Sequence, residues 1–181
     1  PSFLLIILLF SLALSINQGF FSIVPLYLAV ERALDSDMIN KLLIISRVIV
    51  FGVPLLAGWA SDTYGLKKIL YVTLLTSGMA IVLVAIVPAG WIGFSLVMQA
   101  TTSVCLFPLV FAALSHITSQ QDRNIAVAVA IPIGHFIGAG MTPSLIGFSG
   151  DTGRFSTGIM ILGVITVSGI VLAKFLKINQ Q

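Results

Sequence analysis

The sequence predicts an all-α protein that crosses a membrane six times and consists of two inverted three-helix repeats. The membrane follows from composition. Apolar residues make up 58% and charged residues 8% of the 181 residues, and the mean hydropathy is +1.13. Soluble domains carry about 25% charged residues. A water-soluble fold could not cover this much apolar surface, so we expect a polytopic membrane protein.

The repeats follow from an internal similarity. The segment from Pro54 to Thr63 recurs 89 positions later as the segment from Pro143 to Thr152. Proline, leucine, glycine, aspartate and threonine coincide, and an aromatic residue follows the shared glycine in both copies. The offset is about half of the chain. It predicts one repeat over about 1–89 and a second over about 90–181.

Each predicted span lies between clusters of charged residues. The stretches between them are long enough for the roughly 20 residues that a helix needs to cross a hydrocarbon core of about 30 Å. In chain order, the expected spans are 3–30, 39–61, 69–88, 91–116, 124–149 and 155–173.

The basic residues predict the orientation of these spans. Cytoplasmic loops carry an excess of lysine and arginine, and one side of the predicted topology holds Lys67, Lys68, Arg123, Lys174 and Lys177. The other side holds fewer basic residues, beside four acidic ones. We therefore expect an integral protein of the plasma (inner) membrane with both termini in the cytoplasm. The net charge of +3 expresses this loop bias and does not indicate nucleic-acid binding.

The inversion follows from the same topology. Asp62 ends the second span at the predicted cytoplasmic side, whereas its counterpart Asp151 ends the fifth span at the opposite side. The two three-helix units therefore run in opposite directions, as in the inverted repeats of many secondary transporters.

The loop after the second span carries a motif: Gly58, Asp62 four residues on, Gly65 three further, then Lys67 and Lys68. This pattern resembles the signature loop between the second and third helices of a six-helix half in the major facilitator superfamily. The resemblance covers the whole chain and implies a carrier of twelve helices in two halves. Two arginines of the family motif are replaced, by Thr63 and Leu66. Degraded copies of the loop are typical of the C-terminal half.

The resemblance therefore implies that this chain is the C-terminal half, with an N-terminal six-helix half as partner. The function it implies is alternating-access transport of a small solute. Two alternatives stay open: a self-standing six-helix protein that acts as a homodimeric carrier, and a membrane scaffold or sensor that does not transport.

The resemblance implies that the motif residues act as a conformational latch that favours the outward-facing state. Gly58 would let a neighbouring helix approach closely, Asp62 would accept hydrogen bonds from helix N-terminal amides, and Gly65 would permit a tight turn. Lys67 and Lys68 would stabilise the cytoplasmic boundary. A polar turn with basic anchors is the simpler interpretation of the same segment.

Arg47 is the strongest candidate for a substrate-binding residue. It lies about 13 Å inside the second span by helical rise, where an arginine costs at least about 2.5–3.5 kcal/mol. All six acidic residues lie in loops or at helix ends. The counter-charge must come from a bound anion, from the partner half, or from water reached by snorkelling. The resemblance adds that an arginine on the eighth helix of organic-anion, monocarboxylate and nitrate carriers engages the substrate, and Arg47 falls on the corresponding helix.

Four further polar residues lie at similar depth and are candidates for the same site. Asn17 and Gln18 interrupt the first span, and Gln99 and His135 lie on the fourth and fifth spans. Interhelical hydrogen bonding is the alternative role for each. An imidazole can gain a proton near physiological pH, so His135 would add a second positive charge to an anion site.

The sequence offers little support for an enzymatic function. Gly147, Ser149 and Gly150 match a short serine motif of intramembrane proteases, but His135 is about 21 Å from Ser149 along the same helix. The sequence contains no metal-binding cluster, phosphate-binding loop or paired carboxylates. We therefore expect no enzymatic activity, no cofactor and no metal, and expect the lipid bilayer and a small anionic solute as partners.

Overall fold

The computed structural model describes residues 2–118 and 121–176, and every regular element within these ranges is a helix. Six helical segments, called spans 1 to 6 below, are long and apolar enough to cross a membrane: Phe3–Val30, Ser36–Tyr64, Leu66–Ile86, Ala89–Ile117, Arg123–Asp151 and Phe155–Phe175. They confirm the six expected spans to within three residues at each end. Lys177, counted above among the cytoplasmic basic residues, lies outside the described ranges.

Spans 3 and 6 are single α-helices, α5 (Leu66–Ile86) and α10 (Phe155–Phe175), whereas the other four spans are interrupted. Spans 1 and 5 contain π-helical turns, and spans 2 and 4 contain breaks in the α-helix. Span 1 consists of α1 (Ser2–Leu14), η1 (Ser15–Gly19) and α2 (Phe20–Val30), and span 2 of α3 (Ser36–Val48) and α4 (Val53–Tyr64). Span 4 consists of η2 (Ala89–Trp91), α6 (Ile92–Val104) and α7 (Leu106–Ile117), and span 5 of α8 (Arg123–His135), η3 (Phe136–Met141) and α9 (Thr142–Asp151).

Helix boundaries recur at the offset of 89 residues that relates the two similar sequence segments. Both ends of α10 lie 89 positions after the ends of α5. Residues 15–19 of η1 correspond to 104–108, where α6 gives way to α7. The break at 49–52 in span 2 corresponds to 138–141, which lies within η3.

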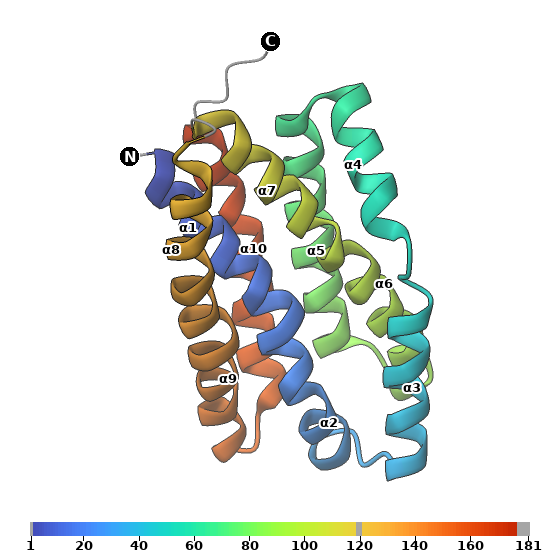
Figure 1. Cartoon of the computed structure of the whole chain (residues 1–181). Helices are drawn as coiled ribbons and strands as arrows, with labels where there is room; N and C mark the ends of the chain where they lie inside the picture. Colours follow the sequence, from blue (N-terminus) through green and yellow to red (C-terminus); the bar gives the residue numbers. More distant parts are fainter. Residues whose placement is uncertain (1, 119–120, 177–181) are drawn as a thin grey trace.

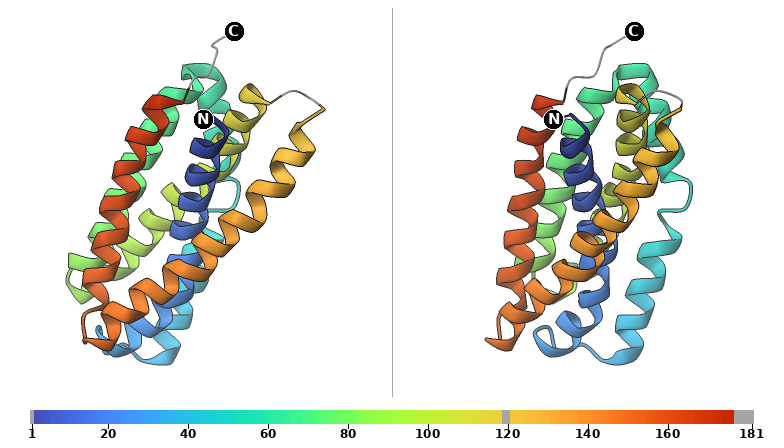
Figure 2. Two further views of the ribbon diagram at one scale, coloured as in Figure 1. Left: turned by 90° about the vertical axis from the view of Figure 1, so that its left-hand side faces the viewer. Right: turned by 60° about the vertical axis from the view of Figure 1, so that its left-hand side comes forward.

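The two uninterrupted helices pack against each other along one side of the bundle (Figure 2). Gly78 on α5 and Gly163 on α10 allow this approach. A methyl group on Gly78 would lie 2.7 Å from the carbonyl oxygen of Gly163, and one on Gly163 would lie 2.9 Å from that of Gly78. Small residues at helix interfaces permit such close backbone packing in membranes. The pair α5–α10 therefore forms a tightly packed wall.

Two charged side chains bind the helix ends at one end of this wall. Arg32 donates from Nη2 to the carbonyl of Ala85, 2.7 Å away at the C-terminal end of α5. The neighbouring Glu31 accepts from the backbone N–H of Ser156 at 3.0 Å, in the first turn of α10, and from its hydroxyl. A cation thus meets the negative end of one helix dipole and a carboxylate the positive end of the other.

A third side chain connects α5 and α10 at the opposite end of the wall. Lys67, in the first turn of α5, donates to the carbonyls of Lys174 and Leu176 at the C-terminal end of α10, at 3.0 and 3.1 Å. These carbonyls lack partners within the helix, and a lysine satisfies them while complementing the dipole. The wall is therefore held at both ends.

Span 1 lies in the centre of the bundle, with span 2 (α3 and α4) and span 5 (α8 and α9) at opposite edges (Figure 1). It is the most buried span, and spans 2 and 5 are the least buried. The beginning of α1 and the end of α10 lie at the same end of the bundle. This arrangement fits an even number of membrane crossings.

We predict that Gly78→Ala destabilises the bundle. The added methyl would lie 2.5 Å from a side-chain carbon of Val167 as well as against the backbone of Gly163, and such overpacking costs about 1–3 kcal/mol. Unfolding by dodecyl sulfate in mixed micelles measures the loss. Gly147→Ala is the matched control, because a methyl there meets nothing within 4 Å and should leave stability equal or higher. Equal stability of the two variants would contradict close packing of the wall.

Candidate functional site

The candidate site forms around the π-helical turn η1 in span 1. A π-turn alters the regular hydrogen bonding of an α-helix and is often found at functional sites. Here the carbonyls of Ile16 and Asn17 each accept a hydrogen bond from a side chain of another span. Gln99 on α6, only 3% exposed, donates from Nε2 to the Ile16 oxygen at 2.7 Å.

Arg47 on α3 supplies the second of these hydrogen bonds. Its Nη2 donates to the backbone oxygen of Asn17 at 3.0 Å and its Nη1 to the side-chain oxygen of Asn17 at 3.3 Å. The guanidinium also lies over the ring of Phe21, with Cζ 3.7 Å from the ring centroid, in a cation–π contact. Arg47 lies about 16 Å from the beginning of α3 by helical rise. The structure thus holds a cation deep in the apolar region.

No carboxylate pairs with Arg47 within the described ranges, so carbonyl oxygens and a ring face are its partners there. A guanidinium has five N–H donors, and these contacts use two of them. The half-buried side chain therefore keeps three donors and its full charge for another partner.

Asn17 provides an unsatisfied donor beside this arginine. The residue is 9% exposed, and its oxygen faces Arg47, which directs its amide nitrogen elsewhere. That nitrogen is buried without a hydrogen-bond partner among the described residues. Buried polar groups without partners are rare in folded proteins.

The side of η1 that carries Ser15 and Gly19 packs directly on the π-turn η3 of span 5. Gly19 and Gly138 meet with no room for a side chain on either. Beside them, Thr142 donates its hydroxyl hydrogen to the Ser15 hydroxyl at 2.9 Å. The two irregular turns therefore support each other, which fixes the side of η1 opposite to its polar contacts.

The five predicted binding residues do not all come together. Arg47, Asn17 and Gln99 converge on η1, as described above. Gln18 is exposed. His135 is also exposed, with Nδ1 2.9 Å from the carbonyl of Ile131 on its own helix, and it lies on span 5, at the opposite edge of the bundle from Arg47 (Figure 1).

The predicted latch residues extend from the middle of α4, which contains Gly58 and Asp62, through Gly65 at the turn to Lys67 and Lys68 in the first turn of α5. Gly65 has φ +95°, which fits the tight turn expected there. A methyl on Gly58 would meet nothing within 4 Å, so the close neighbour expected at this position is not provided by the described chain. Asp62 and Lys68 are exposed, whereas Lys67 binds the end of α10. The latch role of these residues stays a prediction.

Sequence reasoning missed three residues: Phe21, which lies against Arg47, and Ser15 and Thr142, which bond to each other. Phe21 follows Asn17 by four residues, and that spacing places both on one helix face, so it could have been found. Ser15 and Thr142 are 127 residues apart, and no local pattern joins them.

The chain matches no protein-family model and no curated protein. Within the described residues, no three histidine, cysteine, aspartate or glutamate side chains come close enough to hold a metal ion. The arrangement of η1, Arg47 and Asn17 is therefore the basis for a functional proposal.

We predict that Gln99→Leu lowers the free energy of unfolding by about 0.6–2 kcal/mol, because interhelical hydrogen bonds in membranes contribute this much. Thr101→Val is the control. The Thr101 hydroxyl bonds the Val97 carbonyl of its own helix at 2.7 Å, so that variant loses no contact between spans. Equal losses in the two variants, measured in mixed micelles, would show that Gln99 does not connect spans 1 and 4.

Proposed function

We propose that this chain is one six-helix half of a secondary carrier that moves a small organic or inorganic anion across a membrane by alternating access. The resemblance of the segment 58–68 to the major facilitator superfamily motif supports the carrier class. Arg47 supports the anion. The proposal places the protein in the plasma (inner) membrane with both termini in the cytoplasm.

The single observation that carries the proposal is the unpaired charge of Arg47. Ionisable residues deep in membrane spans are costly and usually serve a pathway or a partner. The contacts with Asn17 and Phe21 orient the guanidinium but do not neutralise it. A carboxylate or nitrate would supply the missing negative charge and accept the remaining N–H donors in the paired geometry that arginine offers.

The distribution of irregular helices supports alternating access. Secondary transporters of this kind carry inverted repeats and discontinuous helices around a site near the bilayer midplane. Here the recurrence of helix boundaries at an offset of 89 residues is what two copies of one unit would produce. In this proposal the wall α5–α10 stays rigid while spans 1, 2, 4 and 5 change shape.

The exposed faces of spans 2 and 5 support a missing partner. Trp59 on α4 and Phe148 on α9 correspond in the repeat and are 59% and 75% exposed. The adjacent glycines Gly58 and Gly147 both face open space. We propose that the N-terminal six-helix half covers these faces. A second copy of the chain is the alternative occupant.

We predict that Arg47→Ala in the complete carrier abolishes anion-dependent transport while membrane insertion stays intact. Each charge-assisted hydrogen bond that is lost costs about 1.5–3 kcal/mol and raises the dissociation constant about 10- to 100-fold, so the loss of a pair of them leaves no measurable uptake. Arg47→Lys should be affected less, because lysine keeps the charge and loses the paired donors. Uptake of labelled carboxylates and nitrate by proteoliposomes measures this.

The control for Arg47 is Lys41→Ala, which removes an exposed cation from the same helix α3. It should transport at the rate of the parent protein. Parental affinity and rate in Arg47→Ala would overturn the assignment of the anion to Arg47.

We also predict that the six-helix chain alone catalyses no saturable flux of small carboxylates or nitrate. In this proposal the chain forms only one side of the transport cavity, and alternating access needs two halves that move against each other. Purified chain in liposomes is the test. Robust flux, with cross-linked dimers in the same vesicles, would replace the half-carrier proposal with a homodimeric carrier.

A further inference from the structure

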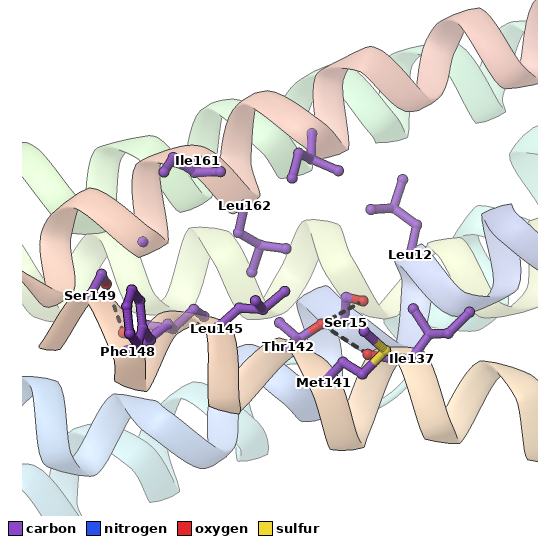
Figure 3. Close-up of a pocket in the computed structure, with 13 residues that line it drawn as sticks. Leu12, Ser15, Ile137, Met141, Thr142, Leu145, Phe148, Ser149, Ile161 and Leu162 are labelled. Carbon is purple, nitrogen blue, oxygen red and sulfur yellow. Dashed lines mark hydrogen bonds between the residues drawn. The ribbon is translucent and has the colours of Figure 1, made fainter. Parts of the chain in front are cut away.

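A cavity of about 400 Å³ lies between span 1, span 5 and α10 (Figure 3), and Arg47 is not among its lining residues. Leu12 and Ser15 of span 1 line it together with residues of η3, α9 and α10. Leu145 and Ile161, on its two sides, are 66% and 55% exposed. The cavity therefore opens sideways, toward the surroundings of the bundle.

The chemistry of the lining selects an apolar occupant. Three hydroxyl side chains reach the cavity, and each already uses its hydrogen within the protein. Ser15 donates to the Ser11 carbonyl, Thr142 to the Ser15 hydroxyl and Ser149 to the Ile146 carbonyl, at 2.9, 2.9 and 2.7 Å. The other lining residues are apolar or glycine. A polar solute would find no free donor there and would lose its hydration.

The length of the cavity matches one leaflet of a bilayer. Its lining extends from Ile137 to Ser149 along span 5, about 18 Å by helical rise, which is somewhat more than half of a hydrocarbon core of about 30 Å. One end lies near the turn between α9 and α10, at the end of the bundle, and the other lies at mid-depth beside η1.

A cation lies just beyond the outer end of the cavity. Arg154 is in the turn that joins the lining residues Ser149 and Gly158, and its backbone N–H donates to the Ser149 carbonyl at 3.1 Å. Its side chain is exposed and makes no hydrogen bond or ion pair within the described ranges. Arginine binds phosphate well.

From these observations we propose that the cavity is a binding site for one acyl chain of a phospholipid in the leaflet on the α9–α10 turn side, with the headgroup phosphate at Arg154. The site is lateral and separate from the arginine of span 2. It requires membrane insertion of the chain but not transport of an anion, so the two proposals fail independently.

The test uses the full chain in phosphatidylcholine vesicles that contain a phosphatidylcholine with a photoreactive diazirine at the middle of one acyl chain. We expect cross-links at Leu145 and Ile161 that saturate with the probe and are competed by unmodified phospholipid. Ile161→Trp fills the cavity and should lose the saturable component. Val72→Trp is the matched control, because Val72 is the repeat counterpart of Ile161 on α5 and is 57% exposed; it should keep that component.

Arg154→Gln tests the headgroup contact and should weaken competition by unmodified phospholipid. Labelling that does not saturate, or that is as strong around Val72 as around Ile161, would overturn the proposal, because it describes lipid in bulk contact. Cross-linking of α9 or α10 to a second copy of the chain instead would also overturn it. The saturation of labelling and the positions of the labels are both measured on the wild-type chain. These two measurements therefore decide the question even if Ile161→Trp folds poorly.

Discussion

The polar interior of the bundle depends on one constraint, which is that backbone carbonyls displaced from a regular helix must be satisfied inside an apolar medium. The π-turn η1 presents the carbonyls of Ile16 and Asn17 to side chains of other spans. Unsatisfied groups of this kind cost several kcal/mol in a bilayer. Gln99 and Arg47 are therefore held where they are by the backbone of span 1, and the candidate site is a by-product of how that helix is interrupted.

The need to satisfy backbone groups also separates the regular helices of the molecule from the irregular ones. The wall α5–α10 has unbroken helices, glycines in contact, and charged side chains at both ends. The four other spans each contain a π-turn or a break. Span 1 joins the two parts, because Glu31 and Arg32 at its end bind α10 and α5 while η1 in its middle meets span 5.

Composition and the segment repeat were enough to predict the helical class, the six spans and their approximate ends, because length and hydropathy alone determine which segments can cross a bilayer. Arg47 and Asn17 stood out as polar groups in apolar stretches, but their hydrogen bond joins residues 30 positions apart and depends on the π-turn, which no periodicity indicates. His135 shows the limit of depth as an argument. Residues at one depth can lie on opposite edges of a bundle. The sequence gives the depth of a residue in the membrane but not the side of the bundle on which its helix lies.

The hydrogen bond from Lys67 to the end of α10 has a consequence for how the protein is made. Donor and acceptor are 107 residues apart, which at about 5–20 residues per second takes the ribosome about 5–20 s. For most of that interval α5 is complete while the partner of its glycine face and the acceptor of its lysine do not yet exist. Until then the side of α5 that will pack on α10 is covered by lipid or by the insertion machinery, and the wall α5–α10 is among the last parts to assemble.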